Sequence, residues 1–313
     1  MLALLIGTLV KVAIMAGFII NVAAILTWYD RRGSAMMQDR IGPNRAMIKL
    51  PFIGELRLAG LLHTAADGVK FFFKEDFIPP KADKILFALA PILCMVPVIT
   101  LTAVIPMTDS ICVSQLHAVG TNGGFWPAML RSGVGCPHAM ANPIVVDGAI
   151  APLDVGILFV FAFAGQGIVG AAIAGWASDN KFSLMGALRA ASQMVSYEVT
   201  MGISLVGAFM IYGTVRLDDM VRWQGENAWG IFVQPVAFFL FFVAAVAETK
   251  RIPFDLPEAE SELVSGYFTE YSGMKFGMFY FAEYMEVVTS SMLLVTIFLG
   301  GWQLPFLHRD GLT

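Results

Sequence analysis

Long apolar stretches alternate with polar connections along most of this chain. Each stretch is long enough to cross a hydrocarbon core of about 30 Å at a helical rise of about 1.5 Å per residue. The six stretches cover approximately residues 2–28, 85–106, 153–176, 185–213, 229–247 and 276–302. This pattern predicts an all-α fold, a polytopic transmembrane helix bundle of about six spans that forms a single integral membrane domain over residues 1–313.

The connection between the first two stretches contains a further periodic segment. Apolar residues recur at helical spacing between Gly60 and Phe73, with Lys70 and Lys74 among them. An apolar face beside basic groups is typical of an amphipathic helix that lies along the membrane interface. We therefore expect an interfacial amphipathic helix within residues 30–84.

Basic residues are distributed unevenly between the connections, and this predicts the orientation of the bundle. Ten Lys and Arg residues lie in the connection 30–84, whereas the connection 107–152 contains one, Arg131. Because cytoplasmic loops carry the excess of Lys and Arg, the first connection is expected in the cytoplasm and the second outside. The N-terminus is then outside, and the acidic connection 248–275 is cytoplasmic. In a bacterium this is the cell inner (plasma) membrane, crossed by several spans.

Composition supports this class and excludes others. Hydrophobic residues make up 57% of the chain and charged residues 14%, with a formal net charge of −4. This balance and the absence of a basic stripe argue against nucleic-acid binding. Cys94, Cys112 and Cys136 lack the spacing of a metal site. Cys112 and Cys136 could pair in an oxidising compartment, whereas Cys94 is expected to be an inert core thiol.

Carboxylates are the least expected residues in so apolar a chain. Carboxylates at membrane depth persist mainly where a water-filled cavity or a proton path needs them. Glu198 lies about ten residues into the fourth stretch. The segment 247–288 contains eight more: Glu248, Asp255, Glu258, Glu260, Glu262, Glu270, Glu283 and Glu286. The pattern indicates proton chemistry at or inside a membrane.

The spacing of these carboxylates bears on their protonation. Glu258 and Glu262 are separated by four residues, as on one face of a helix, and Glu283 and Glu286 by three. Like charges at these spacings repel each other, more strongly at low dielectric, so at least some should hold protons near neutral pH. Two other interpretations stay open. Residues 255–270 could be a solvated acidic loop, and the arginines between 31 and 45 could be lipid anchors.

Five motifs together resemble one family of membrane proteins. They are DRR…QDRIGPN, ADGVKFFFKEDFIP, GWASDNK, ALRAASQMVSYE and ETKRIPFDLPEAESELVSGYFTEYSGMKFGMFYFAEY. The chain resembles the H-type membrane subunit family of bacterial NADH:quinone oxidoreductase, respiratory complex I, which is related to mitochondrial subunit 1. The resemblance covers most of residues 1–302, and the last motif is long and specific.

The resemblance implies a membrane subunit of a proton-translocating NADH:quinone oxidoreductase, a translocase. It implies a quinone-access chamber, with Asp30, Arg31 and Asp67 at family positions and Arg32, Arg40 and Arg45 beside them. It also implies a proton path toward the antiporter-like subunits. The carboxylates assigned to that path are Glu198, Glu248, Asp255, Glu258, Glu260, Glu262, Glu283 and Glu286.

The resemblance also implies which molecules and partners the chain meets. Quinone, either ubiquinone or menaquinone, is the expected substrate. NADH, FMN and iron–sulfur clusters are expected in partner subunits, and no cofactor or metal is expected to be bound by this chain. The expected partners are the peripheral-arm subunits at the quinone site, the small membrane and antiporter-like subunits, and the lipid bilayer.

The sequence departs from the family pattern in two respects. Asp30 and Arg32 stand where the family usually has Glu and Lys, which keeps both charges but changes their geometry. Family members have two further membrane helices, eight spans in all, after the position of Gly300 to Pro305. We expect lipid, another subunit or a separate fragment to cover the face that those helices would occupy.

Three other classes compete with this interpretation. The nearest is the related membrane subunit of an energy-converting hydrogenase, which shares PFD-P-E but diverges after it. A stand-alone transporter is disfavoured because no inverted repeat is visible. A purely structural scaffold would have no need of Glu198 or Glu283.

Overall fold

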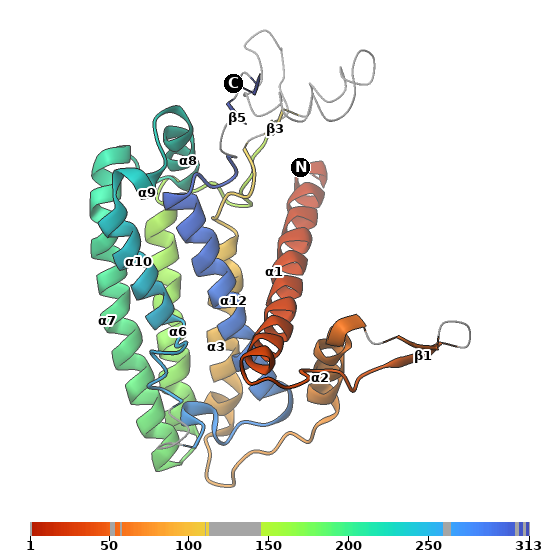
Figure 1. Ribbon diagram of the computed structural model, residues 1–313. Helices are drawn as coiled ribbons and strands as arrows, with labels where there is room; N and C mark the ends of the chain where they lie inside the picture. Colours follow the sequence, from red (N-terminus) through yellow and green to blue (C-terminus); the bar gives the residue numbers. More distant parts are fainter. Residues whose placement is uncertain are drawn as a thin grey trace.

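A bundle of long helices forms the protein (Figure 1). The computed structural model describes residues 2–50, 54–56, 58–109, 111–112, 145–258, 264–303, 307–308 and 311–312. Among these residues, five helices are long and apolar enough to cross a membrane. They are α1 (Leu2–Met37), α3 (Lys84–Thr102), α6 (Gly156–Ala177), α7 (Lys181–Tyr212) and α12 (Gly273–Phe298). The predicted helical membrane bundle is confirmed.

The fifth apolar stretch differs from the long helix expected over 229–247. It is divided into α9 (Gly230–Val233) and α10 (Pro235–Glu248). The break lies at Gln234, whose backbone is extended with φ −137° and ψ 67°. Proline disfavours helical geometry in the residue before it, so Pro235 ends α9 and begins α10. At 14 residues α10 is about 21 Å long, which is less than a hydrocarbon core.

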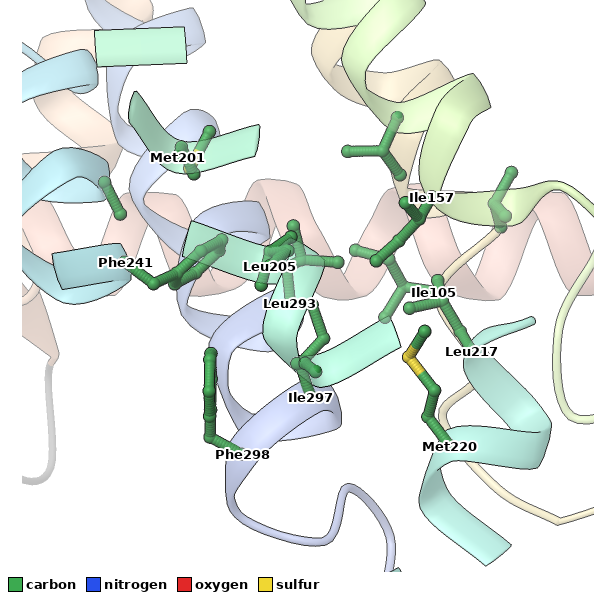
Figure 2. Packing of buried hydrophobic residues seen from close by; sticks show 14 of the residues in the cluster. Ile105, Ile157, Met201, Leu205, Leu217, Met220, Phe241, Leu293, Ile297 and Phe298 are labelled. Carbon is green, nitrogen blue, oxygen red and sulfur yellow. The ribbon is translucent and has the colours of Figure 1, made fainter. Parts of the chain in front are cut away.

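Side chains from five helices and two connections fill the largest part of the interior. α3 packs on α6 and α12, α6 packs on α7, and α7 packs on α10, while α1 contacts the bundle through α12. Figure 2 shows buried side chains of this cluster converging, among them Ile157, Leu205, Phe241 and Leu293. Lipid tails are as apolar as leucine, so close packing rather than removal from water holds such helices together.

Glycines allow the central helices to approach each other closely. A Cβ atom on Gly170 of α6 would lie 2.6 Å from the Sγ atom of Cys94 on α3. A Cβ atom on Gly175 would lie 2.3 Å from the Cβ atom of Ala187 on α7. Small residues at these two positions therefore set the contacts of α6 with both neighbours.

The connections at one end of the bundle pack against each other. The first contains the hairpin of β1 (Ile48–Leu50) and β2 (Gly54–Leu56), the short helix η1 (Leu58–Gly60) and α2 (Leu62–Phe73). α2, which lies within the expected amphipathic segment, packs on α1 and α12. The connection after α10 contains η2 (Gly266–Phe268). It meets the first where the Ser272 hydroxyl donates to the Glu75 carbonyl at 3.2 Å.

The start of α1 lies at the other end of the bundle, together with α8 (Leu217–Glu226), as Figure 1 shows. An ion pair of 3.1 Å between Arg222 and Asp109 ties α8 to the segment after α3. The remaining strands form two antiparallel hairpins of two-residue strands. They are β3 (Ile111–Cys112) with β4 (Val145–Val146), and β5 (Leu307–His308) with β6 (Gly311–Leu312).

Candidate functional site

A small cavity lies among α3, α6, α7, α10 and α12. Its volume is about 60 Å³, which is room for roughly four water molecules. Most of its wall is apolar, but Glu248, Lys250, Tyr267, Glu283 and Glu286 all reach it. Charged and hydroxyl groups facing a space of this size are the partners that ordered water requires. We name this space, with those five side chains, the carboxylate cavity.

Three side chains of the carboxylate cavity form a closed set of polar contacts. The Lys250 ammonium lies 3.6 Å from the Oε1 atom of Glu283. Lys250 also donates to the Tyr267 hydroxyl at 3.2 Å, and that hydroxyl donates to Oε1 of Glu283 at 3.1 Å. Lys250 is 8% exposed and Glu283 is 6% exposed. A buried charge is tolerated when it is paired and hydrogen-bonded, and both conditions are met here.

Protonation states in the connection after α10 follow from burial and charge. Burial alone lowers the pKa of Lys250, but the fields of Tyr267, Glu283 and Glu286 outweigh it and hold that pKa well above its usual value. Burial raises the pKa of Tyr267 far above its usual value, although Lys250 opposes this. Lys250 is therefore an ammonium and Tyr267 a neutral hydroxyl at physiological pH.

Glu248 is the last residue of α10 and is 5% exposed. Its Oε2 atom has no hydrogen-bond partner among the described parts of the chain. A buried carboxylate oxygen in that position either carries a proton or binds water. The carboxylate cavity supplies space for the water.

A second group of polar residues lies around an open hollow at the end of α1. Its volume is about 1030 Å³. The expected chamber residues Asp30, Arg31, Arg40 and Arg45 all line it. Two other expected chamber residues do not. Asp67 of α2 instead forms an ion pair with Arg31, and Arg32 donates to the Ala59 carbonyl at 3.4 Å.

One arginine connects the hollow with the surroundings of the carboxylate cavity. Arg251 lies 3.6 Å from the Oδ2 atom of Asp30, which lines the hollow. Its guanidinium is stacked 4.1 Å from the ring centre of Tyr284 on α12. The Tyr284 hydroxyl in turn donates to Asp30 at 2.8 Å. Because Lys250 is the preceding residue, two adjacent cations serve the two sites: Lys250 faces the carboxylate cavity and Arg251 faces the hollow.

Glu198 is not where the sequence pattern suggested. We expected Glu198, Glu248 and Glu283 to converge on one cavity, but Glu198 does not line it. Glu198 is half-buried beside α6, where a Cβ atom on Gly165 would lie 3.6 Å from its Oε1 atom. Gln193 of the same helix points to the turn after α10 and donates to the Ala247 carbonyl at 2.7 Å. Five residues at 3.6 per turn rotate Glu198 by roughly 140° from Gln193, which directs it away from that turn.

Glu258 lies in a turn, and burial raises its pKa to about 7, with the charges of Glu283 and Asp255 adding to the effect. Glu260 and Glu262 lie outside the described residues, so the expected face shared by Glu258 and Glu262 stays a prediction. Cys136 also lies outside them, and the pairing of Cys112 with Cys136 stays a prediction too. Among the residues described, no three His, Cys, Asp or Glu side chains are grouped so as to hold a metal ion.

The turn that carries Glu258 should lose stability as the pH rises. The pKa of Glu258, about 7, lies above the ordinary value of 4.5, so between these two values the folded turn keeps a proton that an unfolded chain releases. This contribution is complete below that window, falls as the pH rises through it, and amounts to at most about 3 kcal/mol. Glu258→Gln should abolish it. Amide hydrogen exchange of residues 249–258 should show variant and wild type diverging between pH 6 and 8. An equal difference at both values would contradict the assignment.

Two residues of the site were missed by sequence reasoning. Lys250 and Tyr267 had no role in the predicted proton path, yet they hold Glu283 in place. A signal was present: Lys250 follows the apolar α10 by two residues and is surrounded in sequence by carboxylates. The contact with Tyr267 could not be read in this way, because 17 residues separate the two side chains.

Comparison with known proteins shows consistent similarity over nearly the whole chain. The sequence model of the family described as NADH dehydrogenase matches residues 10–312. The first H-type subunit of NADH-quinone oxidoreductase from Cytophaga hutchinsonii is 41% identical over 93% of this chain and 74% of its own length. The second such subunit of Geobacter metallireducens is 41% identical over 97% and 80%. Its counterpart in Flavobacterium psychrophilum is 40% identical over 94% and 76%.

Proposed function

The chain belongs to the NADH dehydrogenase family, with H-type subunits of NADH-quinone oxidoreductase among its relatives, and from this premise we propose how it takes part in complex I. The hollow at the end of α1 forms much of the quinone-access chamber. The carboxylate cavity is the start of the proton path that couples quinone reduction to proton pumping. The observation that carries the proposal is the contact of Arg251 with Asp30 and Tyr284, which links the two sites.

The hollow suits the headgroup of a quinone. Reduction of a quinone takes up two electrons and two protons, and negative charge develops on its oxygens before the protons arrive. Arg31 and Arg40 line the hollow and stabilise such charge, because guanidinium groups donate several hydrogen bonds in a fixed plane. Asp67 pairs with Arg31 and fixes its orientation from α2. Iron–sulfur clusters, FMN and NADH in partner subunits supply the electrons.

The carboxylate cavity suits the transfer of protons. Glu248, Glu283 and Glu286 face one space that is large enough for water, so protons can pass between carboxylates through short chains of hydrogen bonds. New negative charge in the hollow attracts Arg251, which also pairs with Asp30. Because Arg251 lies in the field of Glu283 as well, its response changes the proton affinity of the carboxylate cavity.

The remaining site residues extend the proposed path. Glu198 lies near enough for its charge to act on Glu248, so it follows the carboxylate cavity as a next step rather than forming part of it. Asp255 and Glu258 lie in the turn after Arg251, and the charges of both Glu258 and Glu283 interact. These residues belong to the entry side of the path, together with Glu260 and Glu262.

Orientation and partners follow from the position of the two sites. The hollow, α2 and the acidic connection 248–275 share one end of the bundle, which faces the cytoplasm and the peripheral subunits at the quinone site. The start of α1 then faces the outside of the cell inner membrane. The small membrane subunits and the antiporter-like subunits cover other helix faces, and lipid covers the rest. Relatives at about 40% identity are named as H-type subunits of NADH-quinone oxidoreductase, which favours this assignment over a hydrogenase component.

Arg31→Met tests the chamber assignment. The side chain of Arg31 is 42% exposed, so the fold should survive its loss. We expect quinone reductase activity of the assembled complex to fall by roughly tenfold, mainly through a higher KM for quinone, because one hydrogen-bonded charge contact is worth about 1.5–3 kcal/mol. Oxidation of NADH by a ferricyanide acceptor, which does not use the hollow, should not change. Wild-type quinone kinetics in the assembled variant would show that the hollow is not the chamber.

A further inference from the structure

Lys250 is a buried cation that the proposed route of protons does not itself use. It follows the last residue of α10 by two positions and is 8% exposed. Its backbone has φ 55°, in the left-handed region that side chains other than glycine rarely adopt. Such a conformation persists only where the surroundings fix it, and it is concentrated at functional sites.

The groups that face Lys250 come from every element packed around it. Glu248 ends α10, Tyr267 belongs to η2, and Glu283 and Glu286 lie on α12. Cys94 of α3 is on the same cavity wall. Three carboxylates therefore share one small space with one ammonium, and its direct partners are the Glu283 carboxylate at 3.6 Å and the Tyr267 hydroxyl at 3.2 Å.

The number of protons in this space depends on Lys250. Several ionised carboxylates cannot share a buried space of about 60 Å³ without compensation, because their repulsion is strong at low dielectric. One ammonium compensates one carboxylate. Contact and hydrogen bonding through Tyr267 select Glu283 as that carboxylate. A carboxylate must be ionised to accept a proton, so the ammonium keeps one acceptor open.

We propose that Lys250 is a positioning residue of the proton path: its buried ammonium keeps Glu283 ionised and thereby sets the pH range in which the carboxylate cavity accepts protons. The inference rests on the proposed function. It assigns to Lys250 no transfer of its own proton. Tyr267 takes part by holding the ammonium and the carboxylate in register.

The experiment replaces Lys250 in the intact complex, reconstituted into vesicles. Proton pumping and NADH:quinone activity are measured in parallel between pH 6 and pH 9. In Lys250→Met the cavity loses its cation and binds protons more tightly. We expect pumping at pH 7 to fall at least tenfold and to recover as the pH rises, with the profile displaced upward by about 1–3 pH units. Lys250→Arg keeps the charge and should keep the wild-type pH profile, even if its rate is lower.

Lys181→Met is the matched control, because Lys181 is an exposed lysine at the start of α7 and should leave activity and pH profile unchanged. A Lys250→Met profile at the wild-type pH, whether activity is full or uniformly reduced, would overturn the inference. If Lys250→Met does not assemble, Lys250→Gln is measured with the same criteria. Glu248→Gln separates the two proposals. Normal pumping in that variant counts against the proton path, whereas lost pumping with an undisplaced Lys250→Met profile counts against Lys250 alone.

Discussion

Glu283→Gln should abolish proton pumping and reduce NADH:quinone activity by more than tenfold in the assembled complex. Glutamine keeps the size of the side chain and can accept the hydrogen bond from Tyr267. It cannot accept a proton, and it leaves the Lys250 ammonium without its ion pair in a buried site. Both rates fall because quinone reduction in the hollow and proton uptake in the carboxylate cavity are linked through Arg251. The measurement is parallel recording of pumping and NADH oxidation in reconstituted vesicles.

Glu226→Gln provides the control for this variant. Glu226 is an exposed carboxylate at the end of α8, on the opposite end of the bundle, and its replacement should change neither rate. Assembly is followed by native gel and by NADH:ferricyanide activity. Wild-type pumping by assembled Glu283→Gln complex would remove this residue from the path.

Arg251→Met should separate the two activities. Arg251 contacts Asp30 at 3.6 Å and the Tyr284 ring at 4.1 Å, and methionine retains the apolar contact with the ring but not the charge. Quinone still reaches Arg31 and Arg40 in the hollow, so KM should change little. The number of protons pumped per NADH oxidised should fall several-fold, because the charge that links the two sites is lost. Arg251→Lys, which keeps the charge without the planar stacking, should be intermediate.

A second arginine offers a matched comparison for Arg251. Arg222 of α8 also forms an ion pair with an aspartate, Asp109, at 3.1 Å, but it lies at the opposite end of the bundle. Arg222→Met should lower stability without changing the protons pumped per NADH. An unchanged ratio in Arg251→Met, or an equal decrease in both variants, would contradict the link between hollow and cavity.

The helices could be predicted from the sequence because their signals are local. Apolar length alone indicates α1, α3, α6, α7 and α12, and each helix appears within a few residues of its predicted stretch. The break at Gln234 was not predicted, although Pro235 marked its place. Proline in a membrane helix is often tolerated, as Pro91 and Pro97 within α3 show, so sequence alone does not distinguish a break from an uninterrupted helix.

The candidate site was predictable in its residue types and less so in its geometry. Carboxylates between apolar stretches identified Glu248 and Glu283, which indeed reach one cavity. The direction of Glu198 depends on how α7 is rotated against α6 and α10, and a single sequence contains no record of that rotation. The role of Lys250 depends on a contact with Tyr267 across η2. Contacts of this kind arise from tertiary packing and leave no periodic pattern.

The central claim is that quinone reduction in the hollow changes the protonation of the carboxylate cavity. Infrared difference spectroscopy of the complex before and after quinone reduction tests it most directly, because protonated and ionised carboxyl groups absorb at different frequencies. We predict a carboxyl protonation signal in the wild type that is absent in Glu283→Gln and much weaker in Arg251→Met. An undiminished signal in both variants would contradict the account, and so would a wild-type complex that reduces quinone with no carboxyl signal.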